Sequence, residues 1–182
     1  VLEVVAATAS MSMFENLDGY ALEVRDHCLA VASLARTLAE WWGFHGGGQL
    51  ALCGLLHDIG KLLSIQCGEI AYQELPEEAR HTSDEVHLLE RKLTGYDHAV
   101  LGAHVLAKWG IPEPVPQVVS WHHQPARAYQ HGGDIGIMVA MLRLADRIEV
   151  RLRSSKQIDD EAAAWILADG SAGFLEITAP DL

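Results

Sequence analysis

The sequence predicts an all-α fold, a compact bundle of many helices around a central cavity lined by ligand side chains. Three observations favour this class. Apolar residues recur at steps of three and four along most of the chain, which is the period of a helix with one buried face. Glycines and prolines separate these segments where helices are expected to end. Histidines and carboxylates occur in several separate segments, which indicates a shared site inside the bundle.

The first two elements are expected to be a long helix and then a buried helix. From Tyr20 to Trp42 the apolar residues follow the helical period, and the segment stops at the glycines that begin with Gly43. From Leu50 to Leu63 the chain is nearly all apolar and rich in Leu and Ala, which favours a buried helix over a buried strand. We expect His57 and Asp58 to lie inside this second helix.

Shorter helices are expected in the middle of the chain. Residues 69–80 predict a short helix or a loop, because a proline and clustered acids interrupt the period. The next helices are expected over residues 83–93, capped by a hydroxyl residue, and over residues 98–109, capped by Asp97.

The last third of the chain predicts two helices separated by a loop. Residues 114–125 form the first, residues 126–133 read as a polar loop, and residues 135–152 resume a strong helical pattern. The tail, residues 154–182, offers only a weak helix over 161–168.

Composition limits the class of protein. The 182 residues are 49% hydrophobic and 21% charged, which is typical of one folded domain. A net charge of −12 argues against a nucleic-acid partner, because phosphate backbones are bound by clustered Lys and Arg. No apolar run is long enough to span a membrane and the first residues lack a basic n-region, so we expect a cytoplasmic location. Cys28, Cys53 and Cys67 lack paired spacing and predict no disulfide.

The pair His57 and Asp58 ends an apolar stretch, where an ionised carboxylate is disfavoured without a partner. Imidazole and carboxylate together readily bind a divalent cation. Other segments supply further groups of the same kind. The candidate metal ligands are Glu23, His27, His57, Asp58, His98, His122, His123 and Asp146.

Some of these side chains also have an interpretation that needs no ligand. Glu23 and His27 lie four residues apart on one helix face, which suits a shared ion, but Glu23 could equally be a solvated neighbour and His27 a half-buried histidine. Lys61 returns to the face of His57 and could hold a phosphate, or it could extend to the surface. Arg143 and the two arginines that follow it at steps of four are expected to form a solvated face.

The donor set indicates the kind of metal site. Histidine and carboxylate without thiolate suit Fe, Mn, Zn or Mg, and more than four ligands predict two ions. A carboxylate such as Asp58 would bridge them, and the pair of ions could activate water and hold a phosphate. The candidate catalytic residues are therefore Asp58 and Lys61.

Several motifs, in order, resemble a known family. They are GLLHDIGK at residues 54–61, Glu90, GYDHAVLGA at 95–103, WGIP at 109–112 and HHQP at 122–125. This order is similar to the HDOD branch of the HD superfamily of metal-dependent phosphohydrolases, which is named for the His-Asp doublet. The resemblance covers about residues 20–150 and implies an HD-type bundle. It also implies that one cavity is lined by His27, His57, Asp58, His98, His122, His123 and Asp146.

The resemblance further implies a bacterial signal-transduction module. Residues 1–18 would then be the end of a linking helix from a preceding subdomain, residues 19–153 the HD-type core and residues 154–182 a C-terminal tail. Implied partners are signalling proteins or domains of the same pathway, and a nucleotide is a candidate ligand. The sister HD-GYP branch, which degrades cyclic di-GMP, carries Gly-Tyr-Pro after its histidine doublet. Residues 124–130 here read QPARAYQ instead.

Two functional hypotheses follow, with a metal-free scaffold as a third. The favoured one is a regulatory HDOD module whose site binds metal or a nucleotide. The alternative is a two-metal phosphohydrolase or phosphodiesterase acting on a nucleotide or cyclic dinucleotide, with Asp58 between the ions and Lys61 on the phosphate.

Overall fold

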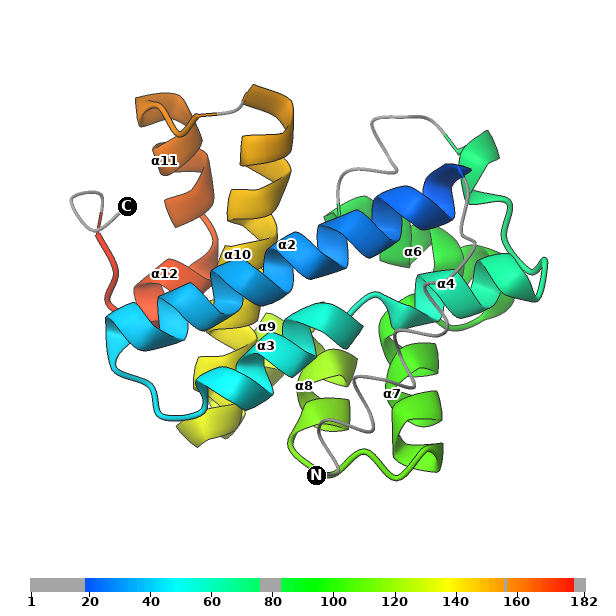
Figure 1. Ribbon diagram of the computed structural model, residues 1–182, viewed down its shortest axis with the longest axis horizontal. Coiled ribbons are helices and arrows are strands. Elements are labelled where there is room, and N and C mark those ends of the chain that lie inside the picture. The colour runs from blue at the N-terminus through cyan, green and yellow to red at the C-terminus, as the bar shows by residue number, and fades with distance from the viewer. Residues whose placement is uncertain (1–18, 76–82, 156, 179–182) are drawn as a thin grey trace.

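The computed structural model describes residues 19–75, 83–155 and 157–178, and these residues form helices and no strands. This confirms the predicted all-α class (Figure 1). The expected linking helix over 1–18 lies outside the described residues. The elements are α2 (Gly19–Trp42), α3 (Gly47–Leu56), α4 (Ile59–Gln66), the 3-10 helix η1 (Tyr72–Glu74), α6 (Ser83–Thr94), α7 (His98–Lys108), α8 (Val115–Trp121), α9 (Pro125–His131), α10 (Gly133–Ser155), α11 (Asp160–Leu167) and α12 (Gly170–Phe174).

The long first helix α2 forms as predicted and packs closely on α3. Its buried face carries small or short side chains, among them Cys28, Val31 and Ala35. The two helices approach so closely at Gly54 that an added Cβ would lie 2.7 Å from the Cα of Ala32. A helix with small residues on its buried face can therefore bring α3, and the turn that follows it, against the centre of the bundle.

The predicted single helix from Leu50 to Leu63 is wrong. The chain forms α3 and α4 instead, with a turn at His57 and Asp58. His57 keeps helical dihedrals, whereas Asp58 leaves them at φ −102° and ψ 11°. The physical reason is that the Asp58 carboxylate contacts His98 and His27 outside this segment as well as Lys61 within it. Apolar periodicity detects burial on both sides of such a turn but does not detect the turn itself.

The start of α4 crosses α7 at very short range. An added Cβ on Gly60 would lie 2.0 Å from the carbonyl oxygen of His98, and one on Gly102 would lie 2.9 Å from the side chain of Ile59. Only residues without a side chain permit this approach. The crossing sets Asp58, two residues before Gly60, beside the first turn of α7.

The predicted cap of α7 is confirmed, whereas the loop predicted after α8 is wrong. The side chain of Asp97 accepts a hydrogen bond from the backbone of Val100, as expected for the start of α7. The loop expected over residues 126–133 is wrong, because Pro125 begins the helix α9. Proline is favoured in a first helical turn, and α9 ends at Gly132, which has φ 69°. A helix this short leaves little periodic signal in the sequence.

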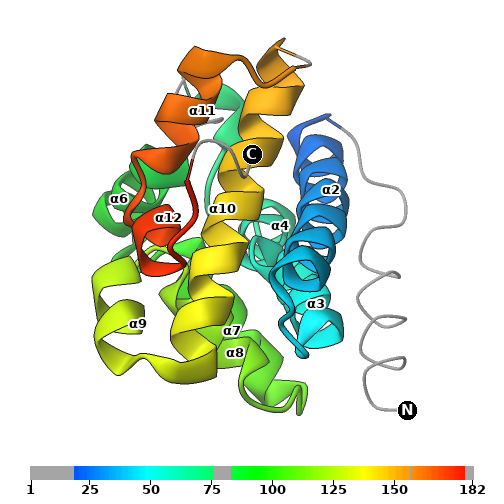
Figure 2. The ribbon, with the colours of Figure 1, turned by 90° about the vertical axis from the view of Figure 1, so that its left-hand side faces the viewer.

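Helix α10 is central to the bundle. Figure 2 shows it between α9, α11 and α12 on one side and α2 and α3 on the other, and it contacts each of them. Its buried residues include Met138, Met141 and Leu142, as the pattern predicted. The expected solvated arginine face is wrong for Arg143, whose side chain is buried. Helix α10 is surrounded on several sides, so a single apolar stripe does not describe it.

The C-terminal tail contributes to the core. The weak helix expected over 161–168 is α11, and α12 follows it. Both pack on α10, and Ile166, Ala172 and Leu175 are buried in the main hydrophobic core. The segment after α10 is therefore part of the folded core.

The cysteines and the limited length of the apolar helices agree with the sequence predictions. Cys28 and Cys53 are buried, Cys67 is exposed, and all three are free thiols, as expected. Across the residues that the structure describes, no helix combines the length and apolar character needed to cross a bilayer.

The crossing of α4 and α7 gives a stability prediction. Gly60→Ala is expected to lower the free energy of unfolding by about 3 kcal/mol or more, because the new methyl group meets backbone that cannot move without separating the helices. For a chain of this size that is a fall in Tm of roughly 6 to 12 °C, measured by thermal unfolding. Gly48→Ala is the control, since a Cβ there meets nothing within 4 Å. Equal melting of the two variants would contradict the close crossing.

Candidate metal centre

The structure brings together most of the predicted ligands from helices far apart in the sequence. Two groups of three side chains each have ligand atoms within 4.8 Å of one another. One group is His27 of α2, His57 of the α3–α4 turn and Asp146 of α10, and the other is His98 of α7 with His122 and His123 after α8.

The first group is arranged around the ring of His27. Its Nε2 atom lies 3.2 Å from Nε2 of His57 and 3.2 Å from Oδ1 of Asp146. Asp146 Oδ1 is buried and accepts no well-aligned hydrogen bond among the described residues. The group thus presents two ring nitrogens and an incompletely satisfied carboxylate oxygen to one point.

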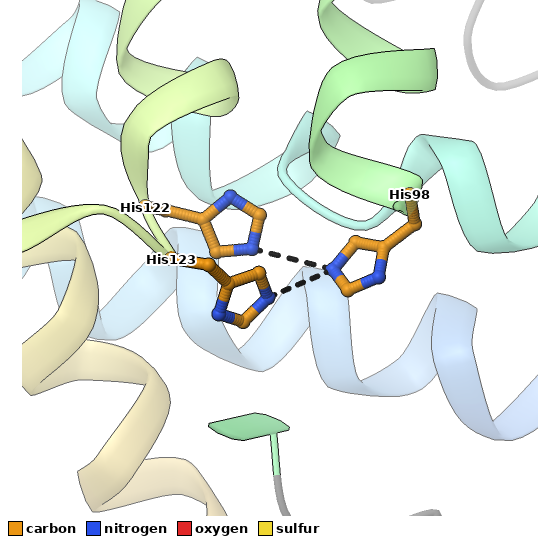
Figure 3. Close-up of side chains that lie close together, drawn as sticks. All are labelled: His98, His122 and His123. Atoms are coloured by element: carbon orange, nitrogen blue, oxygen red, sulfur yellow. Dashed lines mark hydrogen bonds between the residues drawn. The ribbon is translucent and has the colours of Figure 1, made fainter. Parts of the chain in front are cut away.

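The second group is arranged around the ring of His98 (Figure 3). Its Nε2 atom lies 3.4 Å from Nε2 of His122 and 3.0 Å from Nε2 of His123. Figure 3 shows the His122 and His123 rings extending from one chain segment and facing His98 from another. Three imidazole nitrogens therefore converge.

Asp58 lies between the two groups. Its Oδ1 atom is 3.0 Å from Nε2 of His98, and its Oδ2 atom is 3.6 Å from Nε2 of His57 and 3.8 Å from Nε2 of His27. The carboxylate is almost completely buried. Burial alone would raise the pKa of Asp58, but Lys61 and the nearby histidines hold it well below its usual value. Asp58 is therefore a buried anion placed to contact both groups.

The predicted phosphate ligand, Lys61, is engaged by this anion. Its Nζ atom lies 2.6 Å from Oδ2 of Asp58, and the side chain is buried. Burial alone would lower the pKa of Lys61, yet the field of Asp58 raises it above its ordinary value. The ammonium group partly neutralises the carboxylate that separates the two histidine groups.

Backbone carbonyls fix the orientation of two of the rings. The Nδ1 atom of His57 lies 2.8 Å from the carbonyl oxygen of Gly54, and that of His122 lies 2.6 Å from the carbonyl oxygen of Val119. A carbonyl oxygen only accepts, so Nδ1 carries the hydrogen in each ring. The lone pair of each neutral ring is then on Nε2, which faces the centre.

Two carboxylates that the sequence prediction did not assign to the site, Glu90 and Glu149, fix the orientation of the rings of His98 and His27. Glu90 accepts from Nδ1 of His98 at 2.7 Å, and Glu149 accepts from Nδ1 of His27 at 2.6 Å. Glu90 also accepts from the hydroxyl of Tyr72 at 2.7 Å. A carboxylate behind a metal-binding histidine orients its ring and raises its basicity. Burial alone would raise the pKa of each carboxylate, but the neighbouring histidines outweigh this effect and hold both pKa values below the usual value. Both carboxylates are therefore ionised.

The facing Nε2 atoms create a requirement for positive charge. In His27 and His57 these atoms are 3.2 Å apart, and two neutral rings would place lone pair against lone pair. A proton or a cation must lie between them. Burial would lower the pKa of His27, but Asp146 and Glu149 raise it to about 9, so a proton meets the need when no cation is bound.

A divalent cation also fits the distances. Tetrahedral coordination with metal to nitrogen bonds of about 2.0 to 2.1 Å places two ligand atoms roughly 3.3 to 3.4 Å apart. The Nε2 atom of His98 is 3.0 and 3.4 Å from its two partners. Burial lowers the pKa of His122 and His123 well below the usual value, which favours the neutral form that binds metal. The residues present can therefore hold divalent metal.

Two sequence expectations differ from this arrangement. Glu23 lies in neither group and its side chain is exposed, because the neighbouring Val24 occupies the buried face of α2. His87, to which no role was assigned, is buried, and its ring stacks on that of His123 with centroids 4.3 Å apart and planes at 8°. The nearest signal for the missed Glu149 was its position one helical turn after Asp146. For Glu90 the only signal in the sequence was its place among the ordered motifs that resemble the HDOD branch.

Comparison with known proteins gives one family match. The model of the family described as HDOD domain matches residues 1–125. An uncharacterized protein of Treponema pallidum (strain Nichols) is 29% identical over 72 residues, which are 40% of this chain and 14% of that protein.

Two solved structures share the fold. An HDOD domain protein with unknown function from Geobacter sulfurreducens superposes with a TM-score of 0.65 at 23% identity, covering 82% of this chain and 50% of the other. A protein of Shewanella amazonensis SB2B, whose name assigns it provisionally to the phosphohydrolases, superposes with a TM-score of 0.66 at 24% identity, covering 90% and 56%. These likenesses confirm the fold. The chain spans about half the length of each protein.

The contacts of Glu90 give a prediction for the metal-free protein. Glu90→Gln is expected to lower the free energy of unfolding by about 1 to 3 kcal/mol, because the amide cannot accept from both His98 and Tyr72 in a buried site. Urea unfolding measures the change. The matched control is Glu69→Gln, since Glu69 accepts from the hydroxyl of Tyr96 at 2.6 Å on the surface and should change stability by less than about 0.5 kcal/mol. Equal effects of the two substitutions would show that Glu90 is not a special partner.

Proposed function

The chain belongs to the HDOD domain family, and from this membership and the paired histidine groups we propose that it is a regulatory module whose centre binds two divalent ions. One ion would be held by His27, His57 and Asp146, and the other by His98, His122 and His123. Asp58 would contact both. Zn, Fe, Mn and Mg all suit a donor set of imidazole and carboxylate, and the all-histidine group favours Zn or Fe.

The observation that carries this proposal is the burial of the centre. The side chains of His57, Asp58, His98 and His122 are each 3% exposed or less. A substrate the size of a nucleotide needs a cleft that leaves ligand atoms accessible. Closely packed rings instead suit ions that stabilise one arrangement of the helices and so alter a surface that a partner contacts.

The position of Lys61 supports the same conclusion. Its ammonium group is paired with Asp58 in the buried centre, so holding a phosphate would require this contact to open. Breaking a buried ion pair leaves an uncompensated charge and is costly. The paired arrangement is thus suited to a resting, closed centre.

A second function has a specific observation in its favour. Asp58 lies between two groups of ligands, which is the arrangement of a carboxylate that bridges two ions. Two ions, when bound, would supply Lewis-acid chemistry that activates water and neutralises phosphate charge. In such a phosphohydrolase or phosphodiesterase, Asp58 would hold both ions and Lys61 would turn to the phosphate of a nucleotide or cyclic dinucleotide. The name of the Shewanella relative is consistent with this alternative.

The partners and location remain proposals that rest on the family. We propose signalling proteins or domains as partners, a nucleotide as a candidate ligand, and a bacterial cytoplasm as the setting.

Metal content and turnover test the two functions together. The purified protein is expected to contain close to two equivalents of divalent metal by elemental analysis and to hydrolyse neither bis-p-nitrophenyl phosphate nor cyclic dinucleotides. Asp58→Ala should lose most of the metal, because both groups lose the anion between them.

Three outcomes are distinct. Metal without turnover on any of these substrates supports the regulatory module. Turnover that requires metal and is abolished in Asp58→Ala would establish the phosphohydrolase instead. A metal-free protein that gains no stability from added Zn²⁺ or Mn²⁺ would leave only a structural scaffold, and both proposals would fail.

A further inference from the structure

Arg143 of α10 links the histidine doublet to the C-terminal tail. Its Nη1 atom donates to the carbonyl oxygen of His122 at 2.7 Å, and its Nη2 atom donates to Oδ2 of Asp169 at 2.6 Å. The arginine side chain is buried. The two ends of one rigid guanidinium therefore hold two segments of the chain at a fixed separation.

The carbonyl that Arg143 holds controls the orientation of both rings. It belongs to the peptide unit that joins His122 to His123, so fixing it fixes how the two side chains leave the backbone. This peptide lies just past the last residue of α8, where carbonyls have no partner within the helix. Besides Arg143, the turn is held by the hydrogen bond from Gln124 N to the carbonyl of Trp121 and by that from His122 Nδ1 to the carbonyl of Val119.

Asp169 anchors the other end of the guanidinium in the tail. Its Oδ1 atom accepts from the backbone of Ser171 at 2.9 Å and so caps α12. The Ser171 hydroxyl in turn lies 2.5 Å from the hydroxyl of Tyr129 in α9. Burial would raise the pKa of Asp169, but Arg143 lowers it, so the pair is ionised. A buried guanidinium needs such a partner, which makes Asp169 a requirement for the position of Arg143.

The other ligand group is oriented by different contacts. His57 is held by the carbonyl of Gly54 and His27 by Glu149, and neither contact involves the tail. The link from α12 through Arg143 therefore reaches only one half of the centre.

We propose that Arg143 and Asp169 are positioning residues for the ion held by His98, His122 and His123. The α11–α12 tail is then an integral part of that half of the metal centre, and a change in the tail alters one ion site and leaves the other intact. This inference rests on the proposed two-ion function.

The test is a Zn²⁺ titration of the metal-free protein by calorimetry, with the ring nitrogen chemical shifts of the histidines showing which group binds. In Arg143→Gln, the ion at His98, His122 and His123 should bind about 10- to 100-fold more weakly, while the ion at His27, His57 and Asp146 keeps its wild-type affinity. Asp169→Asn is the milder variant, since Asn still caps α12 but loses the charge that holds Arg143.

Asp159→Asn is the matched control. Asp159 caps α11 in the same tail, accepting from the backbone of Ala162 at 2.8 Å, and is exposed. This variant should bind both ions like the wild type. Wild-type affinity at both sites in Arg143→Gln and in Asp169→Asn would overturn the proposal, as would an equal loss at both sites.

A metal-independent measurement separates this proposal from the proposed function. Amide hydrogen exchange over residues 119–124 of the metal-free protein should accelerate in Arg143→Gln and Asp169→Asn and not in Asp159→Asn. If the wild type binds no Zn²⁺, the two-ion function fails, and faster exchange still supports the positioning role of Arg143. Unchanged exchange in both variants overturns that role.

Discussion

The arrangement of the bundle depends on one electrostatic requirement, the compensation of ring nitrogens that face each other around a buried carboxylate. The Nδ1 atoms of four histidines point at acceptors, so their Nε2 atoms face inward, and Asp58 adds a negative charge among them. Positive charge must be present at the centre, whether as Lys61, as protons or as metal. The close crossing at Gly60 and the break between α3 and α4 both serve to place Asp58 at this point.

The groups behind the ligands divide the centre into two halves of different character. Glu149 and a backbone carbonyl orient the rings of the half that contains Asp146. Glu90, another carbonyl and the guanidinium of Arg143 orient the all-histidine half. The first half is therefore held by α2, α3 and α10, and the second by α6, α7, α8 and, through Arg143 of α10, the tail. Asp58 lies beside both halves, but each half has its own ring-orienting groups.

Sequence patterns predicted the helices and the residue types of the site, because helical period and the cost of burying His and Asp are local properties. They did not predict contacts that only packing creates. Glu23 was chosen because it lies four residues from His27, yet the face of α2 that is buried excludes it. Arg143 was expected on a solvated face and Glu90 was given no role beyond its motif, since nothing in the sequence shows that α6 or α10 is enclosed. The turn at Asp58 was missed because contacts of its side chain with His98 and His27 interrupt an otherwise helical run.

The separation of the contacts along the chain has a consequence for biosynthesis. His27 and Glu149 pair across 122 residues. The guanidinium of Arg143, which fixes His122, gains its partner Asp169 only when the chain has reached the tail. Contacts so distant in sequence close slowly and late in folding. During synthesis from the N-terminus, α2 and α3 can pair early, whereas neither half of the centre is complete until α10 or the tail has left the ribosome. The candidate metal centre is thus a feature that a nascent chain acquires late.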